Sequence, residues 1–255
     1  MTKLGHTNFS VTIPHRNTEG FGLNEDAVTK FIDEKVNIVI TLDCGMGDAH
    51  HVKRLTDAGI DVIVTDHHLP NHAVPEAFAI VNPNQDRDTY PNKSLCGSGV
   101  AYKIAQALFV ELRRQKMESR SDSKSSSLSS IFQLLDSIPL GWEKWLLDMT
   151  AIATLSDMVS LTGENRALVT YGLFVLRKSP RVGLRTLLKH LRIKQHALSE
   201  DDVVFMITPR INAASRMDEP ELAYRLLSTQ DEAEAQQLVE HLDGINNERK
   251  GAVAH

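Results

Sequence analysis

The sequence predicts an α/β fold in which an open, mainly parallel sheet flanked by helices is followed by a helical region. One observation is a pair of β-branched apolar runs, residues 37–43 and 61–66, with a helical pattern between them. Another is that this strand–helix–strand spacing of about two dozen residues recurs, which is typical of right-handed βαβ units. A further observation is that the chain has helical patterns from residue 142 onward.

Local signals justify each element at the start of the chain. Residues 9–14 have the β-branched content of a strand. Residues 23–34 follow as a helix, with Asn24 as its N-cap and two acidic residues in its first turn. Residues 37–43 form a continuous apolar run, which is typical of a strand that is covered on both faces.

The next elements complete the predicted sheet. A helix over residues 48–58 ends at Gly59, a residue suited to the C′ position. Residues 61–66 predict a second buried strand, and residues 77–82 predict a third. A long helix is then expected over residues 97–116.

Composition divides the whole chain into four portions. They are an α/β portion (1–115), a serine-rich insertion or linker (116–141), a helical remainder (142–230) and a connecting helix (231–255). Serines and charges without apolar periodicity over residues 118–130 favour a flexible insertion. The helices expected after it cover residues 142–155, 164–177, 183–191, 201–206, 220–227 and 231–249.

Composition also limits the classes of protein to which the chain can belong. Its 255 residues carry 28 Lys and Arg against 33 Asp and Glu, and this net charge of −5 excludes a globally basic coat for nucleic acid. A local basic groove stays possible. The apolar runs are shorter than the about 18 residues of a membrane span, and no secretory signal begins the sequence. Cys44 and Cys96 make neither a disulfide framework nor a CxxC motif, so we expect a cytoplasmic protein.

Ionisable residues follow two of the expected strands. Asp43 ends the first apolar run, and Asp66-His67-His68 ends the next, one βαβ unit further along. The carboxyl ends of parallel strands share one edge of a sheet, where ligands bind. Two carboxylates and two imidazoles that meet there need a cation or a proton between them, and these mixed donors suit Mn²⁺, Zn²⁺ or Fe²⁺. The alternative is that the aspartates are cap or turn residues and that the histidines are simply exposed.

A third acidic residue, Asp157, ends an otherwise apolar helical pattern. An unpaired buried carboxylate is costly, so Asp157 should have a cation, a hydrogen-bond donor or solvent beside it. The alternative is an ordinary turn residue at the C-terminus of a helix.

Several motifs follow one another in an order that a known family shares. They are Asp43-Cys-Gly45, Asp66-His67-His68, the helix start Leu95-Cys-Gly-Ser-Gly-Val-Ala-Tyr-Lys103, and Ala153-Thr-Leu-Ser-Asp157-Met-Val. These segments resemble the motifs of the DHH-superfamily phosphoesterases. Two flanking segments are similar to those of RecJ-type single-stranded-DNA exonucleases, Pro14-His-Arg16-Asn-Thr-Glu-Gly20-Phe-Gly22-Leu23 and Thr208-Pro-Arg210-Ile-Asn212-Ala-Ala-Ser-Arg216-Met.

The resemblance implies a catalytic role for each matching acidic residue and histidine. In that family the residue matching Asp43 bridges two divalent ions, usually Mn²⁺ (or Mg²⁺). His67 and Asp157 would be further ligands, and Asp66 and His68 would complete or support the site. The implied reaction is phosphodiester hydrolysis, in which two metal ions activate a water molecule.

The resemblance also implies phosphate-binding residues. Arg210 and Arg216 would hold the scissile or an adjacent phosphate, because a planar guanidinium binds phosphate oxygens in a bidentate manner. Arg16 and Asn212 are further candidates, and Ser98 would present N–H groups at a helix start. For the arginines a salt bridge is the alternative, and for Ser98 a helix cap.

The family pattern extends beyond this sequence at both ends. An Asp-x-Asp loop precedes the segment that matches residues 9–14, and further substrate-binding domains follow, so we expect a catalytic-core fragment that holds one metal ion. The implied function is 5′→3′ exonuclease cleavage of single-stranded DNA in repair and recombination, with no protein partner assigned. The alternatives are another DHH phosphoesterase, acting on oligonucleotides, cyclic dinucleotides or pyrophosphate, and a catalytically inactive fragment.

Overall fold

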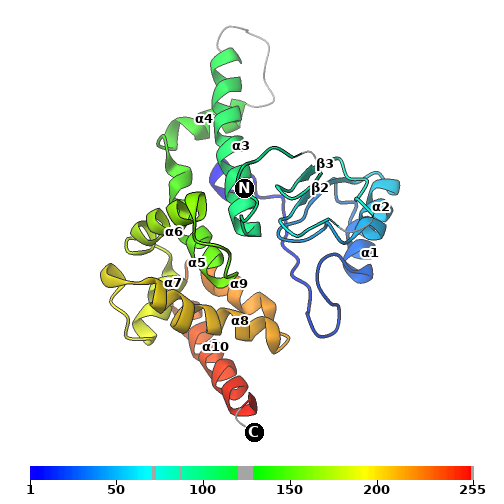
Figure 1. The fold of residues 1–255 in the computed structure, drawn as a ribbon. Helices are drawn as coiled ribbons and strands as arrows, with labels where there is room; N and C mark the ends of the chain where they lie inside the picture. Colours follow the sequence, from blue (N-terminus) through cyan, green and yellow to red (C-terminus); the bar gives the residue numbers. More distant parts are fainter. Residues whose placement is uncertain (71–72, 87, 120–128, 254–255) are drawn as a thin grey trace.

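The chain folds into an α/β part and a helical part. The structure, a computed structural model, describes residues 1–70, 73–86, 88–119 and 129–253. Figure 1 shows the long helix α3 (Gly97–Ser119) standing between the sheet and the helical part. Each part has its own hydrophobic core, one around Val62 and the other around Leu187. This arrangement confirms the predicted fold class.

In the part of the chain that the structure describes, three parallel strands form the sheet, in the order β1 (Ile38–Ile40), β2 (Asp61–Thr65) and β3 (Ala79–Val81). The pairing continues past the end of β1, since the N–H of Asp43 donates to the carbonyl of Thr65 at 2.9 Å. The strands therefore end at one common edge, as the βαβ spacing predicts.

Two helices pack with this sheet in one hydrophobic core. Asn24 caps α1 (Glu25–Asp33), and its side-chain oxygen accepts the N–H of Ala27 at 2.8 Å. Helix α2 (Ala49–Asp57) ends just before Gly59, whose φ of 81° confirms the predicted C′ glycine. Fully buried valine and leucine side chains on the inner faces of both helices fix their positions against β2.

Two expectations for the first strands are wrong. Residues 9–14 form no strand, and Phe9 and Val11 are exposed, with no strand beside them in the described part of the chain. Strand β1 lies at the edge of the sheet and is not covered on both faces, because Ile38 and Ile40 are 52% and 47% exposed. A β-rich sequence pattern reports the propensity of a segment but not whether a partner lies beside it.

The segment expected to be a linker is helical at both ends. Helix α3 continues to Ser119, and α4 (Ser129–Ser137) follows, while residues 120–128 lie outside the described residues. Leu135 and Ile138 pack with Phe109 of α3 in a small separate core, which also includes Leu4 of η1 (Thr2–Leu4). The prediction of a linker rested on the serine content and did not take into account the apolar residues of α4, which pack in this core.

The helical part begins at Trp142. Its elements are η2 (Trp142–Leu146), α5 (Leu147–Ser156), α6 (Gly163–Leu176), α7 (Val182–His190), η3 (Gln195–Ala197), the π-helical η4 (Asp202–Ile207), α8 (Thr208–Arg216), α9 (Pro220–Ser228) and α10 (Glu232–Val253). The expected helices are all present, and α8 is an additional helix that follows η4 directly. Among the described residues, no helix combines the length and apolarity that a membrane span requires.

Gly183 on α7 is expected to tolerate no side chain, because a Cβ there would lie 1.6 Å from the carbonyl oxygen of Leu226. Gly183→Ala should lower the free energy of unfolding by about 1–3 kcal/mol, the usual cost of overpacking. Gly244→Ala on α10, where a Cβ meets nothing within 4 Å, should raise it by about 1 kcal/mol. Urea unfolding of both variants measures the difference, and equal stabilities would contradict this packing.

Candidate metal centre

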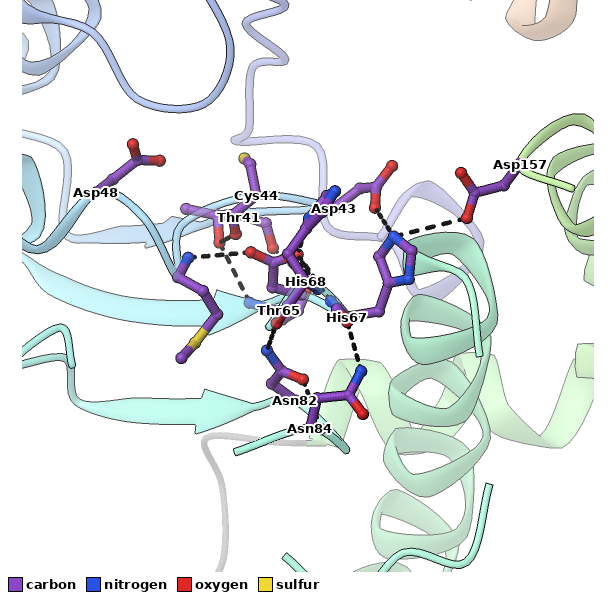
Figure 2. Close-up of polar contacts among 12 residues, drawn as sticks. Thr41, Asp43, Cys44, Asp48, Thr65, His67, His68, Asn82, Asn84 and Asp157 are labelled. Atoms are coloured by element: carbon purple, nitrogen blue, oxygen red, sulfur yellow. Dashed lines mark hydrogen bonds and ion pairs between the residues drawn. The ribbon is translucent and has the colours of Figure 1, made fainter. Parts of the chain in front are cut away.

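Three ionisable side chains meet where the sheet faces the helical part. Asp43 follows β1 in the left-handed backbone region (φ 64°), and His67 follows β2. The Nε2 atom of His67 lies 3.0 Å from Oδ1 of Asp43 and 3.6 Å from Oδ2 of Asp157, the C-cap residue of α5. Figure 2 shows both carboxylates turned toward this one ring nitrogen. One acid therefore comes from each part of the molecule.

Asp66 also follows a strand, yet it has a different environment from Asp43. It is 1% exposed, and its carboxylate accepts the N–H groups of Met46, His67 and His68 at 2.7–3.1 Å. Burial by itself would raise the pKa of Asp66, but these hydrogen bonds, with one from the His68 ring, lower it below the ordinary value. The structure thus places Asp66 behind the cluster, where it holds the backbone that carries both histidines.

His68 lies beside His67 with its ring 62% exposed. Its Nδ1 atom is 2.7 Å from Oδ1 of Asp66, which fixes the ring, so Nε2 is the ring nitrogen that a ligand can approach. One ligand atom from each of Asp43, His67 and His68 lies within 4.8 Å of the other two. Such a spacing suits a shared metal ion.

Two asparagines that sequence reasoning missed support the same loop. The side-chain amide of Asn82, at the end of β3, donates to the carbonyl of His68 at 2.8 Å, and that of Asn84 donates to the carbonyl of His67 at 2.6 Å. Figure 2 shows both amides beneath the histidine loop. The sequence could have identified these two asparagines, because the rule that points to residues after β1 and β2 applies equally to residues after β3.

The start of α3 packs directly against Asp43. A Cβ on Gly97 would lie 2.2 Å from Oδ1 of Asp43, so only glycine allows this approach. Cys44, next to Asp43, is not a free thiolate: burial, together with the charges of Asp48 and Asp66, raises its pKa to about 12. The donors at this edge are therefore carboxylates and imidazoles.

The charges of the cluster perturb one another. Contact with Asp43 raises the pKa of His67, and this effect outweighs the burial that opposes it. Burial raises the pKa of Asp157, and the nearby negative charge of Asp43 adds to that shift. The carboxylates favour a positive charge between them, which either a proton or a cation supplies.

The donor set fits a divalent transition metal. The Nε2 atom of His67 is buried and makes no well-aligned hydrogen bond within the described residues, although two carboxylates lie close to it. Oxygen and imidazole donors together suit Mn²⁺ and related ions. The residues that would hold the ion are Asp43, His67 and Asp157, with His68 within reach.

Arg210, the first residue expected to bind a phosphate, already pairs with an acidic side chain of the protein. Its guanidinium is 10% exposed, donates to Asp243 of α10 at 2.7 Å and also donates to the carbonyl of Met206. His190 adds a contact to the same Asp243 carboxylate at 3.1 Å. The structure therefore places Arg210 in a bridge between α8 and α10.

The other expected phosphate residues are open to solvent to different degrees. Arg216 and Asn212 are exposed on α8, and Ser98 is half-buried in the first turn of α3. Arg16 is exposed and lies 4.5 Å from the centre of the Phe21 ring. Asn17, next to Arg16, donates to the carbonyl of Arg216 at 3.1 Å, so these two arginine segments touch.

The Arg210–Asp243 bridge predicts a pH-dependent stability. Burial opposes the ionisation of Asp243, but His190 and Arg210 outweigh it and lower its pKa. A lowered pKa means that the bridge stabilises the fold above the unfolded value of about 4 and loses this effect as the pH falls through the folded value. Asp243→Asn should cost about 1.5–3 kcal/mol at pH 7, a cost that shrinks in acid.

Urea unfolding of wild type and Asp243→Asn from pH 7 to pH 3 measures this. Asp57→Asn is the matched control, since its ion pair with Lys53 is exposed and should be worth little at any pH. A cost for Asp243→Asn that stays constant with pH would contradict the bridge.

Comparison with known proteins agrees with this geometry. Residues 3–135 match the family described as "DHH family, N-terminal domain". The single-stranded-DNA-specific exonuclease RecJ of Bacillus subtilis is 36% identical over 242 residues, which cover 95% of this chain and 27% of that protein. RecJ of Escherichia coli is 34% identical over 251 residues, which cover 98% of this chain and 41% of that protein. The chain thus spans less than half the length of these curated relatives.

Solved structures give the same result. An exonuclease RecJ bound to manganese superposes with a TM-score of 0.72 at 33% identity, covering 94% of this chain and 54% of that one. RecJ from Thermus thermophilus in complex with Mn²⁺ gives a TM-score of 0.66 at 32% identity, covering 89% and 30%. The matched family segment contains the strand-end acids Asp43 and Asp66 together with both histidines, and the chain belongs to the DHH family.

Proposed function

We propose that this chain is the catalytic core of a metal-dependent 5′→3′ exonuclease that hydrolyses phosphodiester bonds of single-stranded DNA. The observation that carries the proposal is the approach of Asp43 and Asp157 to one buried nitrogen of His67. Its support from relatives is that proteins named single-stranded-DNA-specific exonucleases match 95% and 98% of the chain. The setting we propose is DNA repair and recombination in the cytoplasm.

The proposed cofactor is Mn²⁺, with Mg²⁺ as the alternative, held by Asp43, His67 and Asp157. A divalent ion at such a site lowers the pKa of a bound water and polarises a phosphoryl oxygen. Support comes from the contacts of Asp43 and Asp157 with His67, from the close grouping of Asp43, His67 and His68, and from the titles of the similar structures, which name Mn²⁺. Asp66 is assigned a supporting role, because its oxygens are already engaged by N–H groups.

The substrate would meet the protein through its phosphates. Arg16 and Arg216 are exposed arginines on touching segments, and we assign them contacts to the phosphodiester backbone. Asn212 and the N–H groups beside Ser98 are further candidates for this contact. We propose that Arg210 acts as a pair with Asp243, because its guanidinium already donates to that carboxylate.

A second candidate function is another DHH phosphoesterase activity on oligonucleotides, cyclic dinucleotides or pyrophosphate. Comparing the turnover of a 5′-phosphorylated single strand with that of a dinucleotide in Mn²⁺ separates the two. The proposal expects nucleotide release from the 5′ end of the strand to be the faster reaction. A preference for dinucleotides, or no hydrolysis of either substrate, would contradict it.

Asp43→Asn should reduce this activity by more than about 100-fold, because changes to residues behind a metal ligand already cost about 10- to 100-fold. The removed carboxylate contacts His67, and the variant keeps the size of the side chain. Asp57→Asn removes an exposed carboxylate from α2 and should leave the activity unchanged. Unaltered activity of Asp43→Asn in the exonuclease assay would show that the reaction occurs elsewhere.

The stoichiometry of metal binding tests the ligand assignment separately from catalysis. The described residues contain one group of possible metal ligands, Asp43, His67 and His68, so calorimetry with Mn²⁺ should show at most one tight site, and Asp43→Ala should abolish it. His67→Ala should weaken the same site. Two tight sites together with full nuclease activity would show that the ligands are misassigned.

A further inference from the structure

The approach of both Asp43 and Asp157 to Nε2 of His67 needs a structural explanation. Asp43 belongs to the α/β part and Asp157 to the helical part, and these parts have separate hydrophobic cores. Asp157 also lies where α5 ends and the chain turns through exposed Met158 (φ 56°) toward α6. The region around the start of α3 packs on α5 and α6 through Leu95, Val100, Leu147 and Leu168, and the turn itself is linked to it by hydrogen bonds.

Asn165, in the first turn of α6, makes that connection. Its side chain is buried (1% exposed) and its amide donates two hydrogen bonds, to the carbonyl of Ser160 at 2.9 Å and to the carbonyl of Ser94 at 2.6 Å. Ser160 is three residues after Asp157, in the turn itself. Ser94 belongs to the segment that leads into α3. One amide therefore joins the turn after Asp157 to the start of α3.

The other end of this connection reaches Asp43. Three residues after Ser94, Gly97 packs so closely against Asp43 that no Cβ would fit between them. Cys96, which directly precedes Gly97, is buried and contacts Thr154 of α5, with 3.4 Å between Sγ and Oγ1. The start of α3 thus contacts both Asp43 and α5, the helix that ends at Asp157. Asn165 links it to the turn that follows Asp157.

A second asparagine, Asn92, joins the same hydrogen bonds. We call the two asparagines, Asn92 and Asn165, the clamp. Asn92 donates to the side-chain oxygen of Asn165 at 3.0 Å and accepts the N–H of Ser94 at 3.0 Å. Glu164 next to Asn165 accepts from Tyr90 at 2.9 Å and pairs with Lys103 of α3. Both N–H donors and the oxygen of the Asn165 side chain are therefore engaged, which orients the amide.

We propose that Asn165 is a positioning residue for metal binding, which keeps Asp157 within reach of His67 and Asp43 by clamping the α5–α6 turn to the start of α3. This inference rests on the proposed metal site and adds a residue that touches neither the ion nor a ligand. Such a role requires that Asn165 act on the metal through Asp157.

Calorimetry with Mn²⁺ alone tests this on the full chain. Asn165→Ala should weaken Mn²⁺ binding about tenfold, as loss of a supporting residue does at metal sites. In the Asp157→Asn background the same substitution should cause little further weakening, because the ligand that it positions is already gone. Unchanged Mn²⁺ affinity of Asn165→Ala, or an equal effect in both backgrounds, would overturn the inference.

A matched control separates positioning from general destabilisation. Ser179→Ala removes a buried hydroxyl (2% exposed) that donates to Asp148, away from the cluster. Both alanine variants should lower the urea midpoint, but only Asn165→Ala should weaken Mn²⁺ binding under conditions where both are folded. Equal Mn²⁺ affinities for the two would also overturn the inference.

Two further measurements keep the result interpretable. If Asn165→Ala does not fold, Asn92→Ala removes the partly exposed half of the clamp and should weaken Mn²⁺ binding in the same direction, whereas wild-type affinity there would overturn the inference. Asp43→Asn reports on the site itself. Weakened binding by Asp43→Asn with unchanged binding by Asn165→Ala contradicts the clamp alone, and unchanged binding by both contradicts the metal site as well.

Discussion

Two carboxylates, from parts of the molecule with different hydrophobic cores, lie close to the same buried imidazole nitrogen, and the proposed site depends on this arrangement. At effective dielectric constants near about 20, like charges a few ångströms apart repel by several kcal/mol, so the pair needs a positive charge between them. Contact with Asp43 raises the pKa of His67, whereas burial is the main cause of the raised pKa of Asp157. A proton is one way to meet the need for positive charge. A divalent cation meets it without requiring protonation, which makes the electrostatics of the folded chain complementary to a metal ion.

In the proposed site, two aspartates at similar positions in the sheet have different tasks. Asp43 and Asp66 each follow a parallel strand, but the side chain of Asp43 is 55% exposed and that of Asp66 is 2% exposed. Burial with N–H donors commits the oxygens of Asp66 to the backbone, so this acid organises the histidines. Exposure leaves the oxygens of Asp43 available to a ligand. The order of strands alone does not distinguish these tasks; the donors around each acid do.

The sequence predicted features that depend on local patterns. Strand ends, the Asn24 cap and Gly59 were readable because each depends on neighbours close along the chain. The absent strand at residues 9–14 and the exposed face of β1 depend instead on which segments lie beside them. Arg210 illustrates the same limit at the site, since its partner Asp243 is 33 residues away and only the packing of α8 on α10 reveals it.

Two exposed arginines, Arg16 and Arg216, lie on segments that hydrogen bonds join. His15 Nδ1 contacts the carbonyl oxygen of Asp218 at 2.9 Å, and Asn17 holds the carbonyl of Arg216, so the loop that carries Arg16 is fastened to the end of α8. A polyanion of the proposed kind, with a charge on every repeating unit, can contact several separated arginines at once, which a small anion cannot do. The net charge of −5 is compatible with such a substrate, because what matters is where the cations stand and not their sum.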